Sequence, residues 1–198
     1  LGQAMESMVE AIKSARDHLL EKEAILSATL NSTLDGILVI DQDGEVLSSN
    51  PRFAKMWGIS ESLINSNDDQ ILIDSVLDQL VDPDEFKERT KYLYGSSEES
   101  LEEIALKDGR VFERYSCILK DKDKNGRVWN FRDITERKRA EKELKVFQSA
   151  VAASTDAIGI STSDGRHYYQ NQAFSKMFGD VGEDPPSTLY SDEGVGRQ

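Results

Sequence analysis

Apolar residues recur every three or four positions along the first 27 residues, with charged and small polar residues between them. The apolar positions of this stripe, which Lys22 interrupts once, are Met5, Met8, Ile12, Ala15, Leu19 and Leu26. A stripe this narrow is typical of the heptad seam of a coiled coil. We therefore expect residues 1–27 to form a helix through which two copies of the chain make a homodimer. The alternative is an amphipathic helix packed on its own domain.

From residue 36 the pattern changes to that of β-strands. Gly36–Asp41 is rich in β-branched and apolar residues, and a second such run, Glu45–Ser48, follows the turn pair Asp43-Gly44. An Asp-Gly pair between two strand-like runs is a strong hairpin signal. Asn50 followed by Pro51 then predicts a helix N-cap with proline in the first turn. This helix carries Phe53, Met56 and Trp57 on one face and is expected to end near Gly58.

Residues 60–95 keep helical spacing, and three more strand-like runs follow them, separated by turn residues. These runs are Leu101–Leu106, Val111–Leu119 and Val128–Thr135. Two strands, several helices and three strands predict an α+β fold: a five-stranded antiparallel sheet with helices on one face. Residues 137–153 resume a heptad-like spacing, so a connector helix is expected to leave the domain and the sheet to be flanked by coiled-coil-like helices.

The chain repeats part of itself at an interval of 121 residues. Residues 35–58 align without a gap to residues 156–179, with nine identities in 24 positions. The repeated features are the hairpin turn (Asp164-Gly165), the helix cap (Asn171) and the apolar helix face. Since no equivalents of the last three strands follow, we expect residues 154–198 to be a truncated second copy of the domain.

Several of these features together resemble the PAS domain family. They are Asp35-Gly36-Ile37, the Asp43-Gly44 turn, Asn50 before a helix with Phe53, and the run from Asp133 to Lys138, Asp-Ile-Thr-Glu-Arg-Lys. The resemblance covers residues 28–136. It implies a sensory or dimerisation module that passes conformational change through its flanking helices to an effector, commonly a histidine kinase or a nucleotide cyclase. In that case residues 1–27 are a signalling helix.

The same resemblance implies roles for two residues of the exit motif. Asp133 and Thr135 would tie the last strand to the start of the exit helix and so relay the signal. The alternative is ordinary helix capping, because Asp or Thr before Glu136 satisfies free N–H groups at the positive end of the helix dipole. The two interpretations are compatible.

Charge and composition disfavour several classes of function. The chain has 37 acidic and 24 basic residues and a net charge of −13, which disfavours nucleic acid as a partner. We find no run of 18 apolar residues and no signal peptide, so we expect a soluble, cytoplasmic fragment without membrane contact, whose parent protein can still carry an anchor elsewhere. The motifs of phosphate loops and nucleophilic catalysis are missing from the sequence, so we expect no enzyme activity in this fragment.

The cysteine and histidine positions disfavour flavin and haem as cofactors. Flavin photochemistry in PAS relatives needs a cysteine in an Asn-Cys-Arg phrase on a helix, whereas Cys117, the single cysteine, lies in a predicted strand. Haem relatives use an axial histidine, and the two histidines, His18 and His167, lie outside the domain. Neither a metal site nor a disulfide is expected from these residues. The identity of any cofactor stays open.

A PAS pocket lies between the inner sheet face and the helices, so strand parity selects its lining. The candidate ligand-pocket residues are Leu38, Ile40, Phe53, Trp57, Ile104, Arg114, Ser116, Trp129 and Phe131. The parity of the strand 111–119 is ambiguous, and the register from Gly109 favours the set that contains Arg114. That register places Arg114 near the pocket mouth, where it would hold a carboxylate bidentately. The alternatives are a solvated Arg114 paired with acids, and Trp129 and Phe131 as plain core residues.

Two functions therefore remain. One is a sensor that responds to a small-molecule ligand, and the other is a ligand-free spacer that dimerises and relays strain between helices.

Overall fold

The computed structural model describes residues 2–66, 68–120, 125–163 and 166–181. The predicted turn Asp164-Gly165 lies outside the described residues. The chain divides into two compact units at the boundary between Glu136 and Arg137. Each unit is described by itself below.

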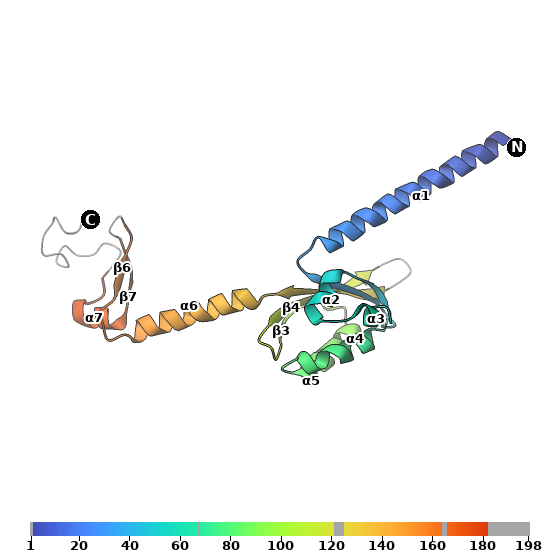
Figure 1. The fold of residues 1–198 in the computed structure, drawn as a ribbon. Coiled ribbons are helices and arrows are strands. Elements are labelled where there is room, and N and C mark those ends of the chain that lie inside the picture. The colour runs from blue at the N-terminus through green and yellow to red at the C-terminus, as the bar shows by residue number, and fades with distance from the viewer. Residues whose placement is uncertain (1, 67, 121–124, 164–165, 182–198) are drawn as a thin grey trace. The chain divides into compact units, whose positions relative to one another are not determined.

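The first unit is built on one antiparallel sheet. Its strands are β1 (Gly36–Asp41), β2 (Val46–Ser49), β3 (Ser100–Ala105), β4 (Val111–Lys120) and β5 (Asn125–Asp133). Their order across the sheet is β2-β1-β5-β4-β3 (Figure 1). All neighbouring strands are antiparallel. In this order β1 lies between its hairpin partner β2 and the last strand β5. The predicted α+β fold with five antiparallel strands is confirmed.

Helices connect β2 to β3. They are α2 (Pro51–Trp57), α3 (Glu61–Ile64), α4 (Asp69–Val76), the 3-10 turn η1 (Leu77–Gln79) and α5 (Pro83–Tyr94). Asn50, Asp68 and Asp82 accept backbone N–H groups at the starts of α2, α4 and α5, as Asn and Asp do at N-caps. Gly58 has a φ of 67° at the end of α2, a conformation that favours glycine. Figure 1 shows α4 and α5 lying together beside the strands.

The core lies between this helical layer and one face of the sheet. Its sheet side is formed by Leu38, Ile40, Ile104, Phe112, Trp129 and Phe131, and the helices contribute Phe53, Met56, Trp57, Leu72, Val76, Phe86 and Leu93. Residues two apart on each strand point to the same face, which explains why Leu38 and Ile40, or Trp129 and Phe131, are buried together. On β4 the buried set is Phe112, Arg114 and Ser116, the parity that the register from Gly109 favours.

Some element boundaries differ from the predicted ones. The last strand was predicted to run to Thr135, but β5 ends at Asp133 and Thr135 is the first residue of α6 (Thr135–Ala153). The reason is local: the Asp133 carboxylate accepts the backbone N–H of Thr135, a pattern that caps a helix rather than extends a ladder. β5 also begins earlier than predicted, at Asn125.

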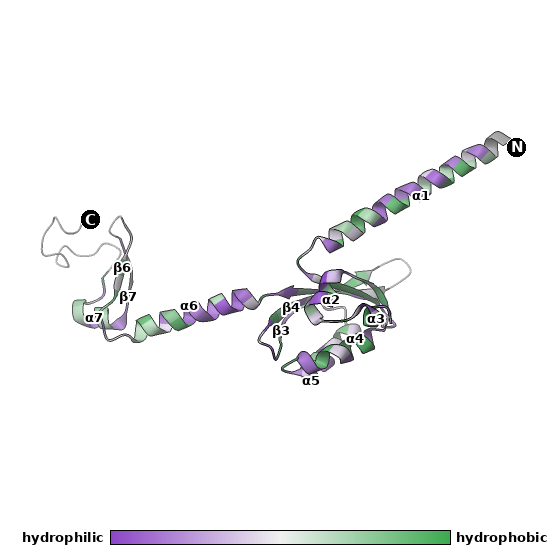
Figure 2. Cartoon of the chain, in the orientation of Figure 1, coloured by the Kyte–Doolittle hydropathy of each residue, from purple (hydrophilic) through white to green (hydrophobic). Residues whose placement is uncertain are grey.

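The N-terminal helix α1 (Gly2–Asn31) is longer than the predicted 1–27. The larger apolar residues of its heptad seam are all more than half exposed, and so are the flanking apolar residues Val9 and Ile25. In Figure 2 apolar positions recur along the helix. Within the described part of the chain, no helix is both long and apolar enough to span a membrane.

The second unit contains most of α6 together with β6 (Gly159–Ser161), β7 (His167–Gln170) and α7 (Gln172–Phe178). These elements repeat β1, β2 and α2. Even the irregularity of the hairpin is repeated: the register shifts between Val39 and Ile40 in the first copy and between Ile160 and Ser161 in the second, again 121 residues apart. The internal repeat in the sequence is therefore a repeat of structure.

Candidate functional site

A cavity of about 30 Å³ lies between the sheet and the helices of the first unit. Six of the nine predicted pocket residues line it: Leu38, Phe53, Trp57, Arg114, Trp129 and Phe131. The other three do not. Ile40 is core, Ile104 lines a separate groove, and Ser116 accepts a hydrogen bond from Arg127 at 2.6 Å.

Aromatic rings fill most of the space beside the cavity. Trp57 of α2 meets Phe112 and Phe131 edge-to-face, with ring centroids 5.1 and 5.3 Å apart, and Phe53 lies 5.6 Å from Phe131. Such pairs stabilise a core beyond their buried area. The remaining volume suits about two water-sized groups, whereas sites for drug-sized ligands span roughly 300–1,000 Å³.

Arg114 is the one basic residue among the described residues that line the cavity. It was predicted near the pocket mouth, with a solvated arginine as the alternative, but its side chain is only 2% exposed. It donates to the Thr90 hydroxyl at 2.7 Å and to a Glu102 carboxylate oxygen at 2.5 Å, and its guanidinium lies 4.7 Å from the ring centre of Phe86 and 5.0 Å from that of Trp129. Burial lowers the pKa of Arg114, and Glu102 opposes this shift. Buried pairing explains why a charge is tolerated here.

Glu102 on β3 is shared by two guanidinium groups. One oxygen accepts from Arg114 and the other from Arg89 of α5, at 2.5 Å. Burial alone raises the pKa of Glu102, but the hydrogen bonds from Arg114 and Arg89 outweigh it, so the pKa lies below its usual value. The strand β3 and the helix α5 are thereby joined through one carboxylate.

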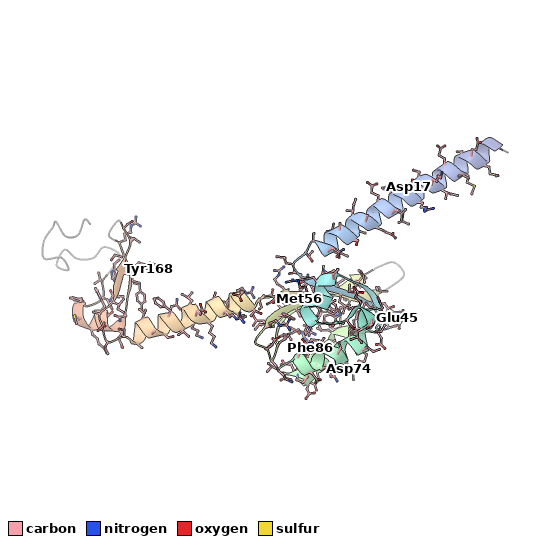
Figure 3. All side chains as sticks on the ribbon, in the orientation of Figure 1. Asp17, Glu45, Met56, Asp74, Phe86 and Tyr168 are labelled. Atoms are coloured by element: carbon pink, nitrogen blue, oxygen red, sulfur yellow. The ribbon has the colours of Figure 1, made fainter. Side chains whose placement is uncertain are left out.

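A second space, a groove of about 420 Å³, lies between α5 and β3. Phe86, labelled in Figure 3, and Arg114 line both this groove and the inner cavity. These two side chains are therefore the partition between the two spaces.

Asp69 and Tyr94 also line the cavity, and sequence reasoning missed both. Asp69 is buried at the start of α4 and accepts a hydrogen bond from the Tyr94 hydroxyl. Burial raises the pKa of Asp69 to about 7, and the neighbouring Asp68 adds to the shift. In the sequence the pair Asp68-Asp69 looks like an exposed helix start, so only the packing of Tyr94 from a distant helix reveals the burial.

The exit motif holds the start of α6 to the sheet. The Asp133 carboxylate accepts the Thr135 N–H at 3.0 Å and its hydroxyl at 2.5 Å, and the Thr135 hydroxyl oxygen accepts the Val111 N–H at 3.0 Å. The Ile134 N–H donates to the Val111 carbonyl oxygen at 3.0 Å. The first residue of α6 is therefore bonded to the first residue of β4, the strand that carries Arg114.

Asn50 makes a corresponding joint at the other end of the domain. Its amide oxygen accepts the N–H groups of Ile37 and Phe53, at 2.9 and 3.0 Å. Its amide nitrogen donates to the carbonyl oxygens of Leu30 and Asp35, both at 2.9 Å. The predicted helix cap is present, but the same side chain also holds the last turn of α1.

Asn171 repeats this joint in the second copy. It accepts from the Ile158 and Phe174 N–H groups, at 3.0 and 2.9 Å, and donates to the carbonyl oxygens of Val151 and Asp156, at 3.1 and 2.8 Å. Each of these partners lies 121 residues after its counterpart around Asn50. The helix α6 therefore stands in the same relation to the second copy as α1 does to the first.

A five-stranded antiparallel sheet of this order, with helices over one face and an exit helix bonded to the start of β4, defines an α+β domain of the PAS type. The family model for the PAS fold matches residues 30–142, more than half of the chain. The chain therefore belongs to the PAS family.

Solved structures that are similar to this chain include several PAS domains. One is a PAS domain of an HTR-like protein from Haloarcula marismortui, with 21% identity and a TM-score of 0.46, covering 62% of this chain and 99% of that one. Another is the PAS domain of Bordetella pertussis BvgS, with 16% identity and a TM-score of 0.46, covering 66% and 98%. A third is a PAS domain from a two-component sensor histidine kinase, with 18% identity and a TM-score of 0.37, covering 59% and 98%. A comparison with curated proteins gives no match.

Proposed function

We propose that residues 30–142 are the sensory domain of a larger signal-transduction protein, and that this domain detects a small ligand and relays the change through α1 and α6 to an effector such as a histidine kinase. A nucleotide cyclase is the other effector class that the family implies. The observation that carries this proposal is the bonding of both helices to the domain, through Asn50 at Leu30 and through Thr135 at Val111. Motion of β4 would pull directly on the first residue of α6.

Two further assignments belong to this proposal. The exposed apolar seam of α1 supports a homodimer formed through that helix, because such a stripe otherwise faces water. The repeated joint at Asn171 supports residues 154–198 as the start of a second PAS domain, for which α6 is the incoming helix.

The relay can be tested in a fusion of residues 1–153 to the catalytic core of a sensor histidine kinase. Thr135→Val removes the hydroxyl that joins α6 to β4 and should change autophosphorylation, whereas Thr135→Ser should retain it. Ser75→Ala is a matched control, because the described hydrogen bond of the Ser75 hydroxyl is to the Leu72 carbonyl oxygen within α4 itself. Equal kinase activity in all four proteins would contradict the relay.

A ligand-free spacer is the second candidate function. The small cavity favours it, because about 30 Å³ holds no more than a few atoms without rearrangement. Native mass spectrometry of freshly purified protein separates the two functions: a retained small molecule supports the sensor, and a bare polypeptide mass in every preparation supports the spacer.

A further inference from the structure

The cavity is short of hydrogen-bond acceptors. Among the buried side-chain nitrogen and oxygen atoms that the structure describes, four have no hydrogen-bond partner, and three of these are N–H donors: Trp57 Nε1, Trp129 Nε1 and Arg114 Nε. All three side chains line the cavity, and each residue is at most 2% exposed. A buried donor without an acceptor costs free energy, so three such donors around one small cavity indicate a site for a group that accepts hydrogen bonds.

Charged groups also lie around the cavity. The described guanidinium groups of Arg89, Arg114 and Arg127 lie near the carboxylates of Glu98 and Glu102, and the Asp69 carboxyl, whose pKa burial raises to about 7, lines the cavity itself. Arg127 donates to the Ser116 hydroxyl and to backbone carbonyl oxygens of Ser96 and Glu98 rather than to a carboxylate. Of the described charged side chains, Arg114 and Asp69 line the cavity itself.

The volumes of the cavity and of the groove limit which kind of molecule can supply the missing hydrogen-bond acceptors. The cavity of about 30 Å³ accommodates two oxygen-sized atoms, which matches a carboxylate group. The groove of about 420 Å³ begins on the other side of Phe86 and Arg114 and has room for the rest of a small organic molecule. Its apolar lining includes Val81 and Ile104.

From these observations we propose that the ligand of this domain is a small organic monocarboxylate, whose carboxylate binds Arg114 and the two indole N–H groups inside the cavity. This proposal rests on the sensory function above and names its ligand class. The carboxylate accepts from Arg114 Nε, and its carbon chain passes Phe86 into the groove. Since Glu102 is already bonded to Arg89, it keeps a partner when Arg114 turns toward the ligand. Binding thereby loosens the contact between β4 and β3.

The protein offers a direct reporter for this site. It contains two tryptophans, Trp57 and Trp129, and both line the cavity. The two indole N–H signals of a ¹⁵N-labelled sample therefore report on the proposed site alone. The probes are acetate, propionate, butyrate, hexanoate and benzoate, each compared with its primary amide at equal ionic strength.

At least one carboxylate should shift both indole signals in a saturable way, and its amide should not. Arg114→Gln should weaken binding by about ten-fold or more, since hydrogen bonds to charged groups are among the stronger ones. Glu102→Gln should tighten binding, because it removes the anion that competes for Arg114. Asp74→Asn, an exposed carboxylate on α4 that lines neither space, is the control and should leave the affinity unchanged. The dispersed amide spectrum of each variant shows whether it is folded.

Several outcomes would overturn the proposal. They are unshifted indole signals with every carboxylate at tens of millimolar, equal shifts with acid and amide, or weaker binding in Glu102→Gln while its fold is retained. The first outcome would mean that ordered water alone accepts hydrogen bonds from the two indole N–H groups and Arg114 Nε. Failure here leaves the kinase-fusion result for Thr135→Val untouched, so the ligand class and the relay are tested separately.

Discussion

The joint at Asn50 supports a quantitative prediction for Asn50→Ala. The substitution removes an acceptor for two backbone N–H groups and a donor for two backbone carbonyl oxygens, in a side chain that is almost fully buried. Loss of a helix cap alone costs about 1 kcal/mol. Each further buried group left without a partner adds about 1 kcal/mol or more. We therefore expect a loss of about 3 to 4 kcal/mol in the free energy of unfolding.

Asp82→Ala is the matched control. Asp82 caps α5 by accepting one N–H, from Glu85 at 3.0 Å, on an exposed surface, so its loss should cost about 1 kcal/mol. Urea denaturation of both variants and the parent chain gives the two free energies, and equal m-values would show that the unfolding transitions are comparable. Amide hydrogen exchange at Thr29 and Ser32 should accelerate in Asn50→Ala alone, since that variant releases the end of α1. Equal losses in the two variants, with unchanged exchange at Ser32, would refute the reasoning.

Three other predictions follow from the described contacts. The double substitution Ile12→Glu and Leu19→Glu should give a folded monomer. If sedimentation shows that the parent chain is already monomeric, the coiled-coil interpretation of α1 is wrong. Burial raises the pKa of Asp69 from 3.8 to about 7, so the stability linked to its proton is complete below about pH 4 and lost as the pH rises through 7. Asp69→Asn should therefore be more stable than the parent at about pH 8, with a smaller advantage at about pH 5, and a parallel pH profile for both proteins would argue against this. Gly126→Ala should weaken β5, because its Cβ would lie 2.2 Å from the Ile40 carbonyl oxygen, and an unchanged melting temperature would count against that contact.

The sequence predicts the elements of the fold well where the signal is local. The Asp43-Gly44 turn, the Asn50 cap and the alternation on β1 and β5 each depend on neighbours within a few residues, and the structure shows the predicted elements there. The end of β5 was placed two residues late, because Ile134 and Thr135 have high strand propensity and only the Asp133 side chain turns the chain into a helix.

The environment of the site is not local, and so it was predicted less well. The partners that bury Arg114 come from Thr90 on α5 and Glu102 on β3, and no spacing in the sequence brings these three residues together. The same holds for Asp69, whose partner Tyr94 lies 25 residues away. Strand parity identifies which side chains face inward, but it does not determine whether an inward cation is solvated or paired.

The two asparagine joints also define where this module can be separated from its neighbours. The PAS match begins at residue 30, and Leu30 supplies the carbonyl oxygen that Asn50 binds. The last turn of α1 is thus physically part of the domain rather than of a linker. A recombination point placed between Leu30 and Asn50 would leave the Asn50 amide with its acceptor only if the incoming helix ended in the same position, and the same applies between Val151 and Asn171. Functional exchange of such domains, in nature or by engineering, therefore requires a junction upstream of Leu30 that carries the helix end along with the sheet.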